Sequence, residues 1–308
     1  LMVRQLGPAG GIAITASHNP AQWNAYKFFG PDGGFLDREK NRILLEIAES
    51  GRFRRAGYRD LGTVTPRTDA IDRHLEKVLA VVDREAIAAR RFRVVVDCVN
   101  GVGGLILQPL LERLGCEAEL FDTDVNAEFP RNPEPLPENL GRLSEAVRRS
   151  GADIGFAVDP DADRLALVDE TGRPIGEERT IVLASDAVLA RAGAAGRGPL
   201  VVNLSTTRAM DDVAARYGMP LFRTPIGEAH VVGRIRETSA VIGGEGNGGV
   251  IYPRVHAGRD AATGVALVLS ALAAEPGLKL SQLNARIPDY VMVKTKFDSQ
   301  GVEAAALV

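Results

Sequence analysis

Residues 93–122 read RVVVDCVNGVGGLILQPLLERLGCEAELFD, and this stretch predicts the fold of the chain. It begins with a run of β-branched residues that is typical of a strand buried on both faces. An apolar helical pattern follows and ends at Gly115, a residue type that favours the left-handed end of a helix. A second strand-like run covers residues 117–122. A strand, a helix and another strand in this order predict a parallel α/β unit.

The same plan occurs a second time in residues 200–225, LVVNLSTTRAMDDVAARYGMPLFRTP, where the helical pattern ends at Gly218. After each copy, an arginine-bearing helical segment leads into a strand, a loop and a further strand. The first of these loops lies within DIGFAVDPDADRLALVD (153–169), and the second lies within AVIGGEGNGGVIYP (240–253). The two most unusual loops of the chain are therefore predicted to occupy equivalent places in a repeated fold.

The composition is that of an ordinary globular protein. Of the 308 residues, 45% are apolar and 25% are charged, and this length favours two or three domains. The formal net charge of −3 does not support a nucleic-acid-binding or membrane-binding surface. No apolar run reaches the length of a membrane span, and Cys98 and Cys116 lack the spacing of metal ligands. We therefore expect a reduced, cytoplasmic protein with no nucleic-acid or membrane partner.

Residues 159–164, DPDADR, place three aspartates at alternate positions. The carboxylates of Asp159, Asp161 and Asp163 would repel one another in a tight loop unless a cation lay between them. Carboxylate oxygens are the ligands that Mg²⁺ and Ca²⁺ prefer. A plain acidic turn at the surface would have the same letters, but Arg164 is suited to a site where a metal and a guanidinium share a phosphate.

Residues 11–15, GIAIT, predict a further strand that is buried on both faces and leads through a loop into a helical pattern. In the overlapping stretch IAITASHNP (12–20), Ser17 and His18 lie in the turn directly after this run. Pro20 then restricts the backbone of this turn. A serine hydroxyl becomes a useful nucleophile only with a base and a charge-stabilising group nearby. From these residues alone, the turn is either an ordinary loop or a nucleophile held out for chemistry.

The chain resembles the α-D-phosphohexomutases in the order and spacing of four motifs. They are TASHNP, NAYKFFGPDGG with Lys27, DPDADR and GGEGNGG. The resemblance covers nearly all of the chain. The segments GEGNGGVIYP and HAGRD look most like phosphoglucosamine mutases and their phosphomannomutase/phosphoglucomutase relatives. It implies an α/β, phosphoglucomutase-like fold of repeated three-layer domains with mixed sheets.

The resemblance also implies roles for the residues of the first two motifs. Ser17 would be a phosphoserine that gives its phosphoryl group to a hexose monophosphate and regains one from the resulting hexose bisphosphate. Mg²⁺ would be held by Ser17 and the three aspartates. Lys27 would transfer protons to and from the sugar hydroxyl, which requires a depressed pKa. His18 would support the phosphoserine, and Arg164 would contact phosphate or position the phosphoserine.

The glycine-rich loop is, by the same resemblance, the part that recognises the sugar. Glu245 would accept hydrogen bonds from two sugar hydroxyls, and Asn247 would assist it. The implied substrate-binding residues are Gly227, Glu228, Glu245, Asn247, His256 and Arg259, and a bracing role is equally plausible for the HAGRD residues, including Asp260. NGVGG (100–104) does not complete a dinucleotide-binding pattern, so we interpret it as a tight turn into a helix.

Four segments are expected from the turn-rich stretches and from the resemblance. They are the C-terminal part of a first domain (1–66), a metal-binding second domain (67–173), a sugar-binding third domain (174–288) and a linker toward a C-terminal phosphate-binding domain (289–308). Both ends of the chain read as cut. We therefore expect a fragment that binds Mg²⁺ yet turns over poorly, since binding of the remote phosphate helps to drive such reactions.

The predicted function is that of a phosphohexose mutase that prefers glucosamine phosphate, with phosphomannomutase/phosphoglucomutase as the alternative. A metal-dependent phosphatase with Ser17 as nucleophile would instead release free phosphate. A sugar-phosphate-binding protein without activity would be expected to have broken motifs, whereas Ser17, Lys27 and the three aspartates are all present. A monomer or a homodimer is expected.

Overall fold

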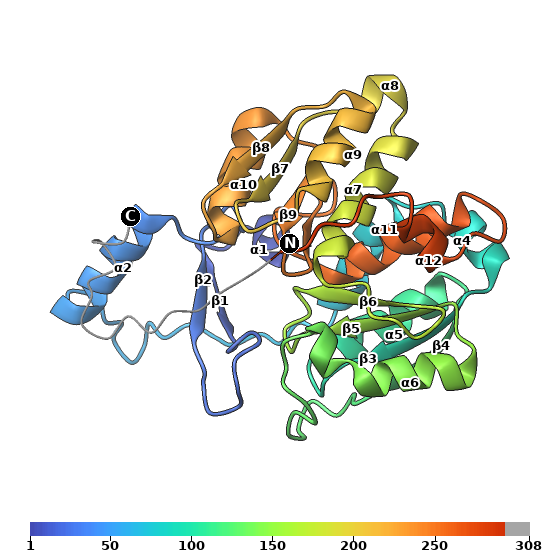
Figure 1. Cartoon of the computed structure of the whole chain (residues 1–308). Helices are drawn as coiled ribbons and strands as arrows, with labels where there is room; N and C mark the ends of the chain where they lie inside the picture. Colours follow the sequence, from blue (N-terminus) through green and yellow to red (C-terminus); the bar gives the residue numbers. More distant parts are fainter. Residues whose placement is uncertain (293–308) are drawn as a thin grey trace, which may run out of the picture.

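The structure is a computed structural model that describes residues 1–292, and its strands form three sheets in this part of the chain (Figure 1). Two of these sheets have four strands each, and the third is a two-stranded hairpin. The α/β prediction is confirmed, because mixed sheets alternate with helices along the chain.

The first four-stranded sheet begins with the quoted stretch 93–122 and continues to residue 169. Its strands are β3 (Arg93–Asp97), β4 (Glu117–Phe121), β5 (Ile154–Val158) and β6 (Leu165–Asp169), in the order β4-β3-β5-β6. β3 runs parallel to β4 and β5, whereas β5 and β6 are antiparallel. Its helices are α5 (Gly103–Arg113), the 3₁₀ turn η1 (Pro137–Asn139) and α6 (Gly141–Ser150).

The second four-stranded sheet has the same topology, so the predicted repeat is confirmed. Its strands are β7 (Leu200–Asn203), β8 (Leu221–Thr224), β9 (Ile242–Glu245) and β10 (Gly249–Ile251), in the order β10-β9-β7-β8. Again the last pair, β9 and β10, is antiparallel. Its helices are α9 (Ala209–Tyr217) and α10 (Glu228–Thr238). The aspartate loop joins β5 to β6 and the glycine-rich loop joins β9 to β10, which are equivalent places.

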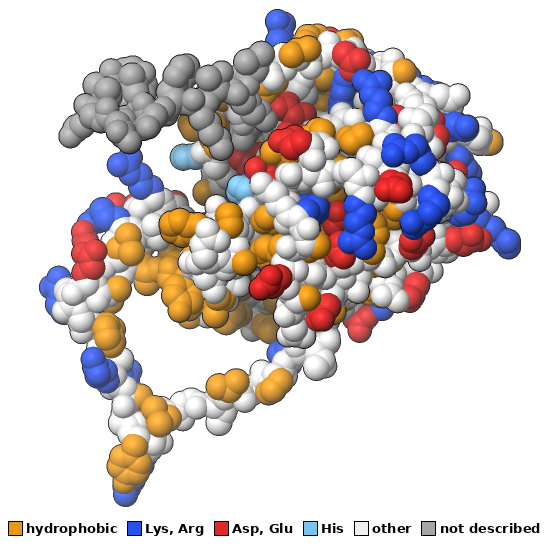
Figure 2. Space-filling view, turned by 60° about the horizontal axis from the view of Figure 1, so that its bottom comes forward, with side chains coloured by type: hydrophobic (Ala, Val, Ile, Leu, Met, Phe, Trp, Pro, Cys, Tyr) orange, Lys and Arg blue, Asp and Glu red, His pale blue; other side chains and the backbone are white. Residues whose placement is uncertain are grey.

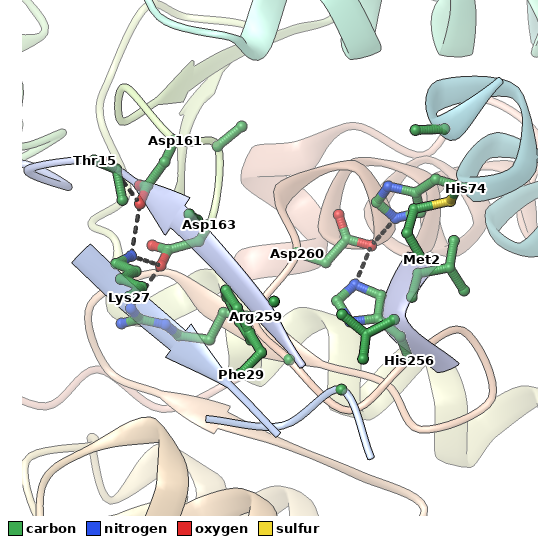
Figure 3. A pocket seen from close by; sticks show the side chains of 18 of the residues that line it. Met2, Thr15, Lys27, Phe29, His74, Asp161, Asp163, His256, Arg259 and Asp260 are labelled. Atoms are coloured by element: carbon green, nitrogen blue, oxygen red, sulfur yellow. Dashed lines mark hydrogen bonds and ion pairs between the residues drawn. The ribbon is translucent and has the colours of Figure 1, made fainter. Parts of the chain in front are cut away.

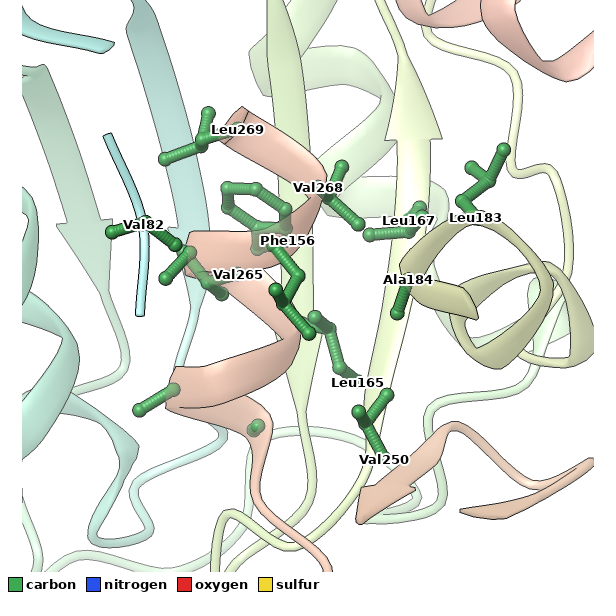
Figure 4. Packing of buried hydrophobic residues seen from close by; sticks show 14 of the residues in the cluster. Val82, Phe156, Leu165, Leu167, Leu183, Ala184, Val250, Val265, Val268 and Leu269 are labelled. Carbon is green, nitrogen blue, oxygen red and sulfur yellow. The ribbon is translucent and has the colours of Figure 1, made fainter. Parts of the chain in front are cut away.

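Helix α11 (Ala261–Ala273) lies in the hydrophobic core between these two units (Figure 4). It packs against α7 (Glu178–Arg191), α3 (Ala70–Leu79) and α4 (Arg84–Arg90). Val265 and Val268 are fully buried in the same cluster as Phe156 of β5 and Leu167 of β6. One hydrophobic core therefore runs across the predicted boundary at residues 173 and 174, and the boundary itself stays a prediction.

The serine motif lies on a separate hairpin of β1 (Gly11–Ile14) and β2 (Tyr26–Phe29). The expectation that residues 11–15 form a strand buried on both faces before a helix is wrong. β1 pairs antiparallel with β2, and Ile12 and Ile14 are 65% and 67% exposed. Short apolar runs do not reveal whether a neighbouring layer will cover them. Figure 2 shows hydrophobic side chains gathered at the left of the main body, where this hairpin lies.

Four further helices complete the described part of the chain. They are α1 (Met2–Leu6), α2 (Arg38–Ser50), α8 (Gly193–Gly196) and α12 (Leu280–Asn284). Helix α2 stands apart from the two four-stranded sheets (Figure 1). NGVGG is a turn into α5, as predicted, because α5 begins at Gly103. None of the helices within residues 1–292 combines the length and the apolar character that a membrane crossing requires. Most of the predicted linker, residues 293–308, lies outside the described residues.

Candidate active site

Ser17 follows β1 in a turn whose backbone is held by a neighbouring threonine. Its φ of +52° is uncommon for a residue other than glycine. The Ser17 amide donates to Thr15 Oγ1 at 2.9 Å, and the Thr15 hydroxyl donates to Asp161 Oδ2 at 3.2 Å. Ser17 Oγ lies 3.2 Å from His18 Nδ1. The serine turn is thus tied to the aspartate loop of the next unit.

The aspartate loop is shaped by one fully buried carboxylate. Asp159 Oδ1 accepts hydrogen bonds from the backbone amides of Asp163 (3.1 Å) and Arg164 (3.0 Å), which closes the loop. The other oxygen of Asp159 is buried without a partner, and so is one oxygen each of Asp161 and Asp163. One oxygen from each of the three lies within 4.8 Å of the others. Buried oxygens without hydrogen bonds and the close approach of the three carboxylates both fit a divalent cation such as Mg²⁺.

The charges of this loop perturb one another strongly. Burial, followed by repulsion from Asp163 and Asp161, raises the pKa of Asp159 well above its ordinary value. Burial also acts to raise the pKa of Asp161, but attraction to the Lys27 ammonium and hydrogen bonds to this carboxylate outweigh it, so the pKa is lowered. Crowded carboxylates with divergent pKa values are common at functional sites.

Lys27 lies on β2 and points into the aspartate loop (Figure 3). Its Nζ is 2.6 Å from Asp161 Oδ2 and 3.4 Å from Asp163 Oδ2. Burial acts to lower the pKa of Lys27, but the carboxylates of Asp163 and Asp161 outweigh it and the pKa is raised. The expectation of a depressed Lys27 pKa is therefore wrong for this arrangement, because two carboxylates surround the ammonium. A cation bound by the aspartates would compete for these oxygens.

His18 and Arg164 meet at a carboxylate that the sequence did not single out. Arg164 Nη1 lies 3.0 Å from Glu134 Oε1, and His18 Nε2 lies 3.8 Å from the same oxygen. Burial and the nearby Arg164 guanidinium lower the pKa of His18. The Nε atom of Arg164 is buried without a hydrogen-bond partner, between Asp159 and Asp163 at 3.9 Å from each. This donor could bind an anion at the aspartate loop.

Glu245, at the end of β9, is nearly fully buried and held by several donors. Its Oε1 accepts from Asn203 Nδ2 (2.8 Å) and from the Gly227 amide (3.1 Å). Its Oε2 accepts from Arg259 Nη1 at 2.8 Å. Asn247, in contrast, folds back on its own turn, where its side-chain oxygen accepts from the Gly249 amide. The side-chain oxygen of Asn247 is thus used within its own turn, and a role for Asn247 beside Glu245 stays a prediction.

Arg259 connects the glycine-rich loop with the aspartate loop. Besides Glu245, its guanidinium pairs with Glu228 Oε2 (2.9 Å) and with Asp163 Oδ2 (2.6 Å). Burial raises the pKa of Glu228 to about 7 even though Arg259 opposes this, and Asp163 and Glu245 add to the rise. One cation thus compensates three carboxylates that come from three different segments.

The side chains of His256 and Asp260 form a second cluster with His74, separate from the three aspartates of the aspartate loop (Figure 3). Both this cluster and the Lys27–Asp161–Asp163 group line one cavity of about 710 Å³. Reasoning from the sequence missed four residues of the site, which are Thr15, Glu134, Asn203 and His74. Each of these residues meets its partner across a long stretch of chain, and only the position of Thr15 directly before the serine motif offers a local signal.

Comparisons with known proteins agree with this arrangement. The models of phosphoglucomutase/phosphomannomutase alpha/beta/alpha domains I, II and III match residues 1–55, 72–172 and 176–290. A phosphoglucomutase/phosphomannomutase of Thermococcus kodakarensis is 41% identical over 95% of this chain, and a probable phosphoglucosamine mutase of Methanopyrus kandleri is 36% identical over 94%. The chain spans 63% and 62% of the length of these two relatives.

Solved structures give the same result. The crystal structure of a phosphoglucomutase/phosphomannomutase family protein from Burkholderia thailandensis matches 92% of this chain with a TM-score of 0.78 and 28% identity. This chain covers 59% of that protein. With three consecutive domain models, curated relatives and a solved structure in agreement, this chain belongs to the phosphoglucomutase/phosphomannomutase family, the α-D-phosphohexomutases.

Proposed function

We propose that this chain is part of a phosphohexose mutase that interconverts hexose 6-phosphate and hexose 1-phosphate through a phosphoserine at Ser17. One observation carries the proposal: a continuous series of polar contacts joins the serine turn to the sugar loop. It runs from Ser17 through Thr15, Asp161, Lys27, Asp163 and Arg259 to Glu245. These contacts support the proposal, because they join the proposed nucleophile, the proposed cation site and the carboxylate proposed to bind sugar hydroxyls.

The reaction would consist of two phosphoryl transfers. In the first, the bond between Ser17 Oγ and phosphorus breaks while a sugar hydroxyl oxygen bonds to phosphorus, forming a hexose bisphosphate; the sugar hydroxyl loses a proton and the freed Ser17 Oγ takes one up. In the second, Ser17 Oγ loses its proton as it attacks the other phosphoryl group of the bisphosphate, and the freed sugar oxygen regains a proton. The Ser17 turn, held by the Thr15 hydroxyl, would keep Oγ in place through both transfers.

Asp159, Asp161 and Asp163 would hold Mg²⁺, together with an oxygen of phosphorylated Ser17. When bound, this ion would neutralise charge on the transferring phosphoryl group. Arg164, whose buried Nε has no hydrogen-bond partner, would add a charged donor at the same group. Lys27 is protonated in the arrangement described here. It would act as a base only after Asp161 and Asp163 have turned to the cation.

Glu245 would bind the sugar hydroxyls. The Gly227 amide and Arg259 hold the Glu245 carboxylate, and Glu228 lies beside it as a second partner of Arg259. We propose glucosamine phosphate as the preferred substrate, with glucose and mannose phosphates as the alternatives. The relatives support all three classes: besides the two described above, a phosphoglucosamine/phosphogalactosamine mutase of Sulfurisphaera tokodaii is 32% identical over 96% of the chain. Asn247 contacts its own turn, so its part in sugar selection remains a proposal.

Intact-mass analysis after incubation with a hexose bisphosphate and Mg²⁺ tests the phosphoserine. We expect one added phosphoryl group in the parent protein and none in Ser17→Ala. Ser205→Ala is the matched control, because Ser205 lies in the loop after β7 and its hydroxyl donates to Asn203. Phosphorylation that persists in Ser17→Ala would contradict the mechanism.

A second assay separates a mutase from a phosphatase and ranks the sugars. Glucosamine, glucose and mannose 6-phosphates are offered in parallel, and both the 1-phosphates and free phosphate are measured. Isomerised product with little free phosphate supports the mutase, and release of phosphate alone supports the phosphatase. Equal rates on all three sugars would defeat the preference for glucosamine.

A further inference from the structure

Three side chains that are distant in sequence converge outside the aspartate loop. His74 comes from α3, His256 from the segment after β10, and Asp260 is the N-cap residue of α11. His74 Nε2 lies 2.7 Å from Asp260 Oδ2, and His256 Nε2 lies 3.4 Å from the same oxygen. Figure 3 shows both imidazole rings directed at this one carboxylate.

The geometry is close to that of a tetrahedral metal site. With metal–ligand bonds of about 2.0–2.1 Å, neighbouring ligand atoms of a tetrahedral Zn²⁺ site lie roughly 3.3 Å apart, and two bound imidazole rings have centres about 5 Å apart. The centres of the His74 and His256 rings are 5.3 Å apart, and the rings are inclined at 81°. One ligand atom from each of the three residues lies within 4.8 Å of the others.

We propose that His74, His256 and Asp260 form a second metal site, selective for Zn²⁺-like ions and distinct from the Mg²⁺ site of the aspartate loop. Two imidazole nitrogens and one carboxylate are a donor set that suits Zn²⁺ and Co²⁺, whereas an all-oxygen set suits Mg²⁺. The two sites therefore differ in metal preference. This inference does not depend on the proposed mutase activity.

The surroundings of Asp260 are those of an oriented ligand. Its Oδ1 accepts from the Ala262 amide at 3.0 Å as the cap of α11, and the Thr263 hydroxyl donates to its Oδ2. Such contacts fix the direction of a ligating carboxylate. Asp260 is buried, but His74 and His256 are 19% and 17% exposed and line the cavity. The cavity gives an ion access and leaves a fourth position for water.

An ion at this site would tie α3 to the first turn of α11 and to residues 256–260. The same short segment carries Arg259, which holds Asp163, Glu228 and Glu245. Binding of the ion would therefore restrict the backbone on which Arg259 depends. The site would act as a structural clamp next to the sugar loop.

The test is a titration of the chelator-treated protein with Co²⁺ and Zn²⁺ at about pH 8, where most histidine side chains are neutral and can bind metal. A large excess of Mg²⁺ is kept present to occupy the aspartate loop. We expect one equivalent of Co²⁺ with a tetrahedral visible spectrum, displaced by Zn²⁺. His74→Ala and His256→Ala should each weaken binding about 10–100-fold or more.

His230→Ala is the matched control, because His230 lies on α10 outside the cluster and should leave the titration unchanged. Equal affinity in the parent and in His74→Ala, or an equal loss in His230→Ala, would overturn the proposal. If a variant does not fold, anomalous diffraction at the zinc edge from Zn²⁺-soaked parent crystals decides. A peak between the three side chains is expected, and no peak there refutes the site.

Discussion

The substitution Asp159→Asn separates metal binding from folding, because an asparagine side chain resembles the protonated form of this carboxyl. The introduced amide oxygen can still accept from the backbone amides of Asp163 and Arg164, and the introduced NH₂ group can donate toward Asp161. What is lost is one negative charge among three carboxylates whose oxygens lie within 4.8 Å of one another.

The magnitude follows from that separation. At an effective dielectric constant of about 20, two charges less than 5 Å apart repel by roughly 3–4 kcal/mol. Lys27 and Arg259 compensate part of this repulsion, and partial protonation of Asp159 relieves more. Without a divalent cation, we therefore expect Asp159→Asn to raise the free energy of unfolding by about 1–2 kcal/mol.

Mg²⁺ should reverse the order of stability. An ion at a concentration 100 times its dissociation constant stabilises the folded parent by about 2.7 kcal/mol, and the variant should gain less than about 1 kcal/mol. Chemical unfolding with chelator and with Mg²⁺ measures both effects. Asp169→Asn is the control, since Asp169 is another buried aspartate, at the end of β6 and outside the triad. It should keep the full Mg²⁺ response.

Two results would refute this reasoning. If Mg²⁺ stabilises Asp159→Asn as much as the parent, Asp159 is not a ligand. If the variant is less stable than the parent in chelator by about 2 kcal/mol or more, the three carboxylates are not in strained repulsion, and the loop is an ordinary hydrogen-bonded turn.

Three further outcomes are expected. Lys27→Met should lower the free energy of unfolding by about 2–3 kcal/mol in chelator and by less in Mg²⁺, because Asp161 loses its closest cation; denaturant unfolding measures this. Burial raises the pKa of Glu228 to about 7, so this side chain binds a proton more tightly in the folded protein than in the unfolded chain. The free energy of unfolding should therefore fall by about 2–4 kcal/mol as pH rises from about 4.5 to 7. Glu228→Gln should make the free energy of unfolding less dependent on pH in this range, and an unchanged pH dependence would contradict the prediction. Burial acts to lower the pKa of His74, but Asp260 outweighs it and the pKa is raised. The His74–Asp260 pair therefore stabilises the folded protein fully below about pH 6.5, and this stabilisation is lost as pH rises through the raised pKa of His74. Melting curves recorded with chelator should show this pH dependence in the parent but not in His74→Ala.

The sequence predicted the repeated units well because their signals are local. The strand runs, the helices ending at Gly115 and Gly218, and the loops after β5 and β9 each lie within one short stretch. Both sheets accordingly have the same topology, as the predicted repeat requires. Residues 11–15 were misinterpreted because the same apolar letters suit a buried strand and a hairpin strand with an exposed face.

The charge pattern of the site was harder to predict. Lys27 and the aspartates were recognised individually, but the direction of the Lys27 pKa depends on which charges surround it in space. Two carboxylates lie within 3.4 Å of its ammonium, and the sequence places them more than 130 residues away. The pairing of Arg259 with three carboxylates and the His74–Asp260 contact could not be predicted either, because they also join residues from separate segments of the chain.

The burial of α11 has a consequence for the order in which the protein can fold. Helices α3 and α4 pack against α11, yet α11 follows them by about 180 residues, a stretch that takes roughly 10–40 s to synthesise at usual rates. During that time the apolar faces of α3 and α4 lack their final neighbour. A nascent chain would therefore expose an aggregation-prone surface until α11 leaves the ribosome, and chaperone dependence should be greatest for chains stalled before residue 261.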